Sequence, residues 1–116
     1  MNEREYIRSK LAKFRKDDII FTEHTEIRLL QRQLKREEII ENIINPSRLE
    51  YAIREEAKSL HEEKFDCYFG YSKTRCHRYV LAVNKKVIVV TAVKINRKWQ
   101  RIAEKKLKSI RTLRRK

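Results

Sequence analysis

The longest apolar run of the chain reads Arg78-Tyr-Val-Leu-Ala-Val-Asn84 and continues as Lys85-Lys-Val-Ile-Val-Val-Thr-Ala-Val-Lys-Ile95. β-Branched residues dominate the run, and Asn84 tolerates the positive φ of a tight turn, so a central β-hairpin is predicted. Its second half has two apolar faces, with Val87, Val89, Thr91 and Val93 on one and Ile88, Val90 and Ala92 on the other. This alternation predicts a strand buried on both sides, which the rest of the chain must cover.

The rest of the chain alternates between helical and extended patterns. Helices are predicted over residues 3–16, 23–33, 36–45 and 98–113, and further strands over 19–21, 48–54 and 65–71. Thr22 is the predicted N-cap of the second helix, whose predicted buried stripe is Ile27, Leu30 and Leu34. We therefore expect one α+β domain over residues 1–116. Two helices would pack on a four- to five-stranded antiparallel sheet, with extra N-terminal and C-terminal helices.

The charge of the chain is strongly basic and unevenly distributed. Thirty Lys or Arg residues stand against 16 Asp or Glu, giving a net charge of +14. From Lys94 to the end, eleven Lys or Arg accompany one acid, Glu104, so this segment holds +10 of the +14. Such an excess is typical of proteins that bind a polyanion, most often nucleic acid. A lysine-rich surface without such a partner is the alternative.

Compartment and cofactor signals are few. The N-terminal residues are polar and charged, and no apolar run approaches the length of a bilayer span, so a cytoplasmic protein without membrane contact is predicted. Two cysteines, Cys67 and Cys76, are too few for a disulfide scaffold. Together with His61 and His77 they could hold a metal in principle, but no pair has a recognised ligand spacing. We therefore predict neither a metal nor a cofactor.

The first candidate site is a ridge of His24, Arg28 and Arg32, spaced i, i+4, i+8 on the second predicted helix. Two guanidiniums one turn apart can hold phosphate oxygens, and a histidine beside them can move a proton near neutral pH. These are components of an RNA-cleaving site. The same spacing also suits a solvated helix face whose cations pair with neighbouring acids.

The second candidate is His77 with Arg78 and Tyr79, at the start of the central hairpin. Alternation places His77 and Tyr79 on one face and Arg78 on the other, and Lys94 lies at the far end of the partner strand. These groups could flank a phosphate or stack on a base. A polar strand start at the sheet edge is the alternative.

The third candidate is the basic C-terminal helix. Its apolar side chains fall on one side, which could dock on its own sheet or on a partner, while the other side could follow a phosphate backbone. The predicted nucleic-acid-binding residues are Arg97, Lys98, Trp99, Arg101, Lys105, Lys108 and Arg111.

Three segments of the sequence carry a family resemblance. They are Glu23-His24 with Arg28 and Arg32, then Arg36-Glu37-Glu38-Ile39-Ile40 with Asn45-Pro46, and last Val87-Ile88-Val89-Val90-Thr91-Ala92-Val93. Together they resemble the small proteins grouped as domain of unknown function 4258, whose pattern opens with His-x-x-x-Arg-x-x-x-Arg. The resemblance covers residues 19–95 and leaves out the N-terminal helix in 1–18 and the basic segment 97–116. Gln33 stands where the family usually has Gly.

That family resembles the RelE, ParE and BrnT toxins of toxin–antitoxin pairs. The resemblance implies a RelE-like fold and an endoribonuclease that acts on mRNA, at the ribosome or free, and is neutralised by an acidic antitoxin. In this hypothesis no metal takes part. His24 transfers the proton, Arg28 and Arg32 hold the phosphate, and Tyr79 and Lys94 line the opposite wall.

Two other functions stay open from the sequence. A nucleic-acid-binding protein or regulator without catalysis explains the basic charge equally well and needs no acid–base pair. A protein-interaction module would dock through the C-terminal helix on a partner with an acidic surface.

Overall fold

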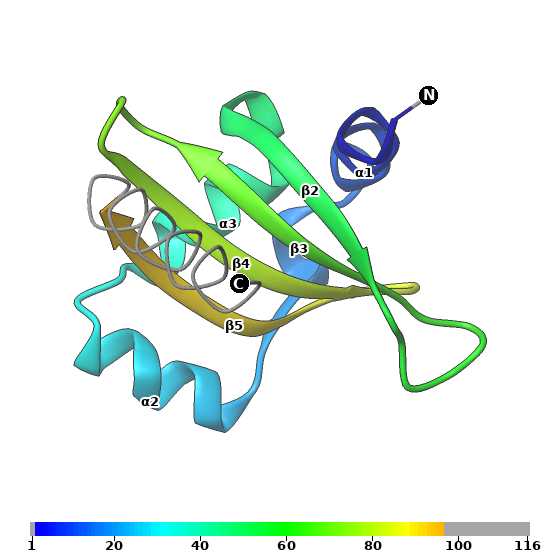
Figure 1. Cartoon of the computed structure of the whole chain (residues 1–116). Coiled ribbons are helices and arrows are strands. Elements are labelled where there is room, and N and C mark those ends of the chain that lie inside the picture. The colour runs from blue at the N-terminus through cyan, green and yellow to red at the C-terminus, as the bar shows by residue number, and fades with distance from the viewer. Residues whose placement is uncertain (1, 97–116) are drawn as a thin grey trace, which may run out of the picture.

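A computed structural model describes residues 2–96, which form an α+β fold of three α-helices and five strands (Figure 1). The helices are α1 (Glu3–Leu11), α2 (Glu23–Gln31) and α3 (Arg36–Ile44). The strands are β1 (Ile19–Phe21), β2 (Leu49–Glu55), β3 (Glu63–Gly70), β4 (Arg75–Val83) and β5 (Val87–Asn96). Short 3-10 helices, η1 (Lys16–Asp18) and η2 (Pro46–Arg48), precede β1 and β2. The predicted α+β class and the central hairpin are confirmed. The positive φ expected at Asn84 is not, because Gln33 is the only residue among 2–96 with a positive φ.

The five strands form one mixed sheet in the order β1-β5-β4-β3-β2. Strands β2 to β5 are an antiparallel meander, but β1 pairs with β5 in parallel, so the prediction of a wholly antiparallel sheet is wrong. The helices α2 and α3 carry the chain from β1 at one edge to β2 at the other. The direction of β1 depends on this crossover. The hydrophobic alternation of a strand carries no information about the direction in which the strand runs.

A β-bulge in β5 changes the faces that its sequence pattern predicts. Leu81 pairs with Val89 and Val80 with Thr91, so within this ladder Val90 pairs with no residue of β4. Beyond the bulge the predicted faces are exchanged, which places Ala92 rather than Thr91 on the core side. The prediction of burial on both sides is also wrong, because 36% of Val90 is exposed.

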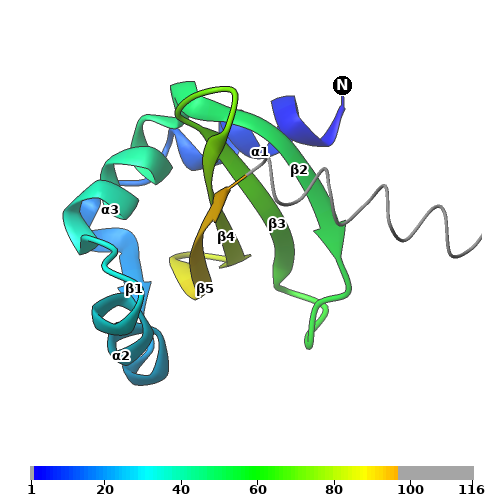
Figure 2. The ribbon, with the colours of Figure 1, turned by 60° about the vertical axis from the view of Figure 1, so that its left-hand side comes forward.

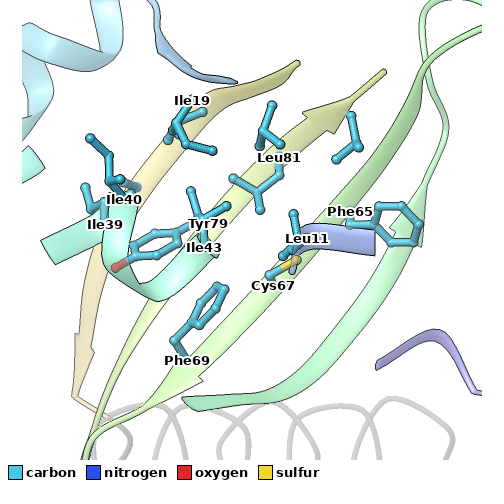
Figure 3. Close-up of a cluster of buried hydrophobic side chains, with 14 of the residues drawn as sticks. Leu11, Ile19, Ile39, Ile40, Ile43, Phe65, Cys67, Phe69, Tyr79 and Leu81 are labelled. Carbon is cyan, nitrogen blue, oxygen red and sulfur yellow. The ribbon is translucent and has the colours of Figure 1, made fainter. Parts of the chain in front are cut away.

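The hydrophobic core lies between one face of the sheet and the helices. Figures 1 and 2 show α1 and α3 against that face, with α2 beside the edge formed by β1 and β5. Ile39 and Ile43 of α3 are fully buried in the same core cluster as Tyr79, whose ring lies 4.9 Å from that of Phe69 (Figure 3). Each such side chain contributes about 1.5–3 kcal/mol by leaving water. Within the described part of the chain, no helix is long and apolar enough to cross a membrane.

Helix α2 begins as predicted but buries a different face. The Thr22 side chain accepts a hydrogen bond from the Thr25 N–H and caps the helix. The predicted stripe is wrong at Ile27 and Leu30, which are 52% and 83% exposed, because Thr25 and Leu29 face the sheet instead. The Thr25 hydroxyl donates to the carbonyl oxygens of β5 beside the bulge, so a hydrogen-bonding residue fixes the buried face.

The end of α2 is a Schellman motif built on a non-glycine residue. Gln33 has φ 55°, in the left-handed region that favours glycine. The Leu34 N–H donates to the Leu29 carbonyl at 2.9 Å, and the Gln33 N–H donates to the Leu30 carbonyl at 3.4 Å. Buried Leu29 and Leu34 belong to the same core cluster. The helix therefore ends at Gln31, two residues earlier than predicted.

Helix α1 ends at Leu11 rather than at residue 16. The Asp18 carboxylate accepts a hydrogen bond from the Arg15 N–H at 2.9 Å, which turns the chain into η1 and towards β1. The helix predicted over 98–113 lies outside the described residues.

Candidate functional site

A pocket of about 460 Å³ opens where β4 starts and β5 ends. Strand pairing sets Arg75 opposite Asn96 and His77 opposite Lys94, so four polar residues stand in two adjacent rows. The bulge at Val90 brings Lys94 to the same face as His77. Other polar groups of the lining come from α3 and from the β3–β4 turn, namely Glu38 and Tyr71.

The imidazole of His77 is the most constrained group of this pocket. Only 6% of the residue is exposed. Its Nδ1 lies 2.6 Å from the hydroxyl of Tyr79, and its Nε2 lies 3.4 Å from Oε1 of Glu38. Tyr71 donates from its hydroxyl to the same Glu38 oxygen at 2.9 Å. One oxygen of Glu38 therefore accepts a hydrogen bond from Tyr71 and also lies close to the imidazole of His77.

The buried amide of Asn42 fixes the direction of these hydrogen bonds. Its Nδ2 donates to the hydroxyl of Tyr71 at 2.7 Å and to the hydroxyl of Tyr79 at 2.9 Å. Because both hydroxyls accept from Asn42, Tyr79 directs its own hydrogen to Nδ1 of His77. The network thus assigns the proton of neutral His77 to Nε2, facing Glu38.

Burial and charge both keep His77 neutral. Burial lowers the pKa of its imidazole, and the cationic side chains of Lys94 and Arg48 lower it further, against the opposing effect of Glu38. Burial likewise raises the pKa of Tyr79, whose hydroxyl stays protonated. The pocket therefore presents a neutral N–H donor beside a carboxylate, with cations around them.

Tyr71 forms one wall of the pocket and is held from four sides. Its ring lies 4.5 Å from the ring of His77, and the Arg48 guanidinium lies 4.3 Å over its centroid. Its hydroxyl is fixed by Asn42 and Glu38. The tight turn after β3 holds its backbone through the carbonyl of Arg75.

The predicted ridge on α2 does not line this pocket. His24 and Arg28 are exposed, and Arg28 contacts Gln31 at 3.4 Å. Arg32 is half-buried, and its Nη1 donates a hydrogen bond to the carbonyl of Ala92 at 2.9 Å. Its guanidinium is therefore bound to the backbone of β5. Within residues 2–96, His24, Arg28 and Arg32 are therefore not gathered with the second candidate site, and their catalytic roles stay predictions.

Of the two other predicted residues, Lys94 reaches the pocket, whereas Tyr79 does not line it. Lys94 is exposed and lines it. Tyr79 is completely buried, so its hydroxyl acts on His77 rather than on a bound molecule. Arg78 lies on the opposite face and forms a bidentate pair with Asp66 at 2.8 and 2.7 Å.

Sequence reasoning missed Glu38, Asn42, Tyr71 and Arg75. Glu38 looked like an ordinary acid in the first turn of a helix. The available signal was Asn42, one turn after Glu38 and next to Ile43 on the apolar face of α3, since a buried amide needs polar partners.

The predicted RNA-binding positions after Asn96 cannot be placed in the site. Arg97, Lys98, Trp99, Arg101, Lys105, Lys108 and Arg111 lie outside the described residues. Within residues 2–96, no group of three or more His, Cys, Asp or Glu side chains could hold a metal ion. Cys67 and Cys76 are both buried free thiols.

Comparison with known protein families, curated proteins and solved structures gives no match to this chain. The resemblance to domain of unknown function 4258 and to RelE-like toxins therefore stays a prediction from the sequence.

Proposed function

We propose that the protein binds RNA and cleaves its backbone at the pocket between Glu38 and Lys94, without a metal ion. One observation carries the proposal. A carboxylate and a neutral histidine lie 3.4 Å apart in a pocket that is also lined by Lys94 and Arg75. Acid, base and positive charge in one cavity are what attack of a 2′-hydroxyl on the adjacent phosphate requires.

Each side chain has a distinct role in this reaction. Glu38 accepts the proton of the 2′-hydroxyl while the 2′-oxygen of the ribose forms a bond to phosphorus. Nε2–H of His77 positions the carboxylate of Glu38, and the guanidinium of Arg75 stabilises the negative charge on the non-bridging oxygens. The bond from phosphorus to the 5′-oxygen breaks, and the ammonium of Lys94 donates a proton to that oxygen. The products carry a 2′,3′-cyclic phosphate and a 5′-hydroxyl.

Tyr79 and Asn42 are positioning residues in this scheme. Tyr79 keeps Nδ1 of His77 an acceptor, so the histidine proton stays on Nε2, beside Glu38. Asn42 holds Tyr79 and Tyr71 together.

The biological setting is part of the same proposal. We infer a cytoplasmic, RelE-like toxin that is neutralised by an acidic antitoxin. Its support is the sequence resemblance over residues 19–95 and the net charge of +14. Expression of the wild-type chain alone should then slow growth, whereas Glu38→Gln should not.

Labelled single-stranded RNA incubated with purified protein and EDTA tests the chemistry. The wild type should release fragments ending in a cyclic phosphate. Glu38→Gln keeps the size of the side chain and should reduce the rate by about 10²-fold or more, as expected for a lost general base. His24→Ala is the control, since His24 is exposed on α2 outside the pocket. A loss of rate confined to His24→Ala would move the active site to the α2 ridge.

RNA binding without catalysis is the second candidate function. The net charge of +14 favours it without any acid–base pair. Tight, salt-dependent binding with no cleavage, on free RNA or on ribosomes, would establish this reading instead.

A further inference from the structure

Tyr71 contacts both His77, with which it lines the pocket, and Arg48. The guanidinium of Arg48 lies over one side of the Tyr71 ring at 4.3 Å, and the His77 ring lies 4.5 Å from the same ring. His77 is buried, Tyr71 is 36% exposed and Arg48 is exposed. These three side chains therefore lead from the buried imidazole of the proposed site to an exposed guanidinium.

Arg48 is anchored but keeps its charge available. Its Nη1 donates to the carbonyl oxygen of Gly70 at 3.3 Å. Among residues 2–96 it forms no ion pair with a carboxylate, unlike Arg36, Arg54 and Arg78. By covering the Tyr71 ring and binding the Gly70 carbonyl, Arg48 helps to hold the turn after β3. Its positive charge is not neutralised by a carboxylate among residues 2–96 and is available to a ligand.

We propose that Arg48, backed by Tyr71, is a stacking subsite for one nucleobase of single-stranded RNA. The inference rests on the proposed RNA-cleaving function and adds to it a base-binding position. Bases stack well on guanidinium planes and on aromatic rings when they are not already stacked in a duplex. The base would belong to a nucleotide next to the phosphate held by Lys94 and Arg75. Base-paired RNA would not fill the subsite.

A charge-preserving substitution separates stacking from simple attraction. Lysine keeps the positive charge of Arg48 but lacks the planar guanidinium. Arg48→Lys should therefore weaken binding of a short oligonucleotide roughly tenfold, the size of one base-stacking contact. It should leave unchanged the binding of the same oligonucleotide with abasic sugars around the cleavage position. The salt dependence should also be unchanged, because the number of charges is the same.

Fluorescence anisotropy with 2′-fluoro oligonucleotides, which cannot be cleaved through a 2′-hydroxyl, gives these affinities. Arg36→Lys is the matched control, because Arg36 also lies over a ring, at 4.9 Å, but that ring is Phe21, which does not line the pocket, whereas Tyr71 does. Equal thermal unfolding of both variants excludes a folding defect. If Arg48→Lys binds the base-bearing and abasic strands like the wild type, the subsite is refuted while the proposed function stands. If the wild type binds neither strand, both are refuted.

Discussion

The carboxylate of Glu63 should stabilise the fold at neutral pH and lose that effect in acid. It lies where α1 meets β2 and β3, away from the candidate site. Tyr6 donates to both of its oxygens at 2.8 Å, Arg54 donates at 2.7 Å, and Lys10 forms an ion pair with it. Glu63→Gln removes the charge and keeps the size of the side chain.

The magnitude follows from the pKa of Glu63. Burial alone would raise it, but hydrogen bonds from Lys10, Tyr6 and Arg54 prevail and lower it from 4.5 to about 2. At about 1.4 kcal/mol per pKa unit this corresponds to roughly 3–4 kcal/mol. Because the side chain is 24% exposed, solvent screening reduces the expected contribution to about 1–2 kcal/mol.

The sign of the pH dependence is fixed by the lowered pKa. The folded state binds fewer protons than the unfolded state between pH 4.5 and about 2. Stability from Glu63 is therefore complete above pH 4.5 and declines as the pH falls through this window. Urea unfolding should show Glu63→Gln less stable than the wild type by about 1–2 kcal/mol at pH 7, with the difference shrinking towards pH 2.5.

Glu62→Gln is the control for this measurement, because Glu62 is the neighbouring acid and forms no ion pair within residues 2–96. It should change stability little at either pH. A Glu63→Gln deficit of equal size at pH 7 and pH 2.5 would refute the reasoning, since it would reflect packing rather than charge.

Three further predictions concern α2 and the pocket. Gln33→Gly should raise the free energy of unfolding by about 0.5–1 kcal/mol in urea titrations, because glycine adopts the left-handed φ of 55° without strain; an unchanged or lower value would contradict this. Thr25→Val should lower it by about 1–2 kcal/mol, since its hydroxyl serves two carbonyls of β5, whereas the exposed Thr74→Val should not. For His77, whose pKa is lowered from 6.5 chiefly by burial, wild-type stability should fall as the pH drops below 6.5. His77→Gln should flatten that decline, and a decline of equal slope in both proteins would exclude His77 as its source.

The sequence predicted those elements whose pattern has a single physical meaning. The isoleucines of α3 recur at helical spacing and are bounded by Pro46, and α3 was predicted to within one residue. The strands of the meander were predicted with shifts of one to three residues at their ends. The buried face of α2 was predicted wrongly, because the apolar pattern favoured Ile27 and Leu30, whereas the packed face includes Thr25. A hydropathy pattern counts that threonine as polar and cannot see the carbonyls that it binds.

The candidate site was predicted only where it lies on the hairpin. His77, Tyr79 and Lys94 belong to neighbouring strands, so strand pairing alone brings them close. Glu38 and Asn42 come from a helix about forty residues earlier, and their approach depends on how α3 lies on the sheet. No local pattern encodes that placement, which explains why both residues were missed.

The bulge at Val90 connects the failed prediction about β5 with the site. Without it, strict alternation would place Lys94 on the face opposite His77, because Val87 and Val89 face the core. A bulge disrupts the ladder and leaves carbonyl groups that need donors. Thr25 supplies such a donor to Val89 and Val90, both at 3.0 Å. Thr25 on the buried face of α2 thus stabilises the β-bulge that places Lys94 on the pocket side. The same face is the one that the hydrophobic pattern failed to predict. The threonine that binds these two carbonyls thus belongs to the helix beside the sheet edge, far in sequence from the proposed reacting group, Lys94.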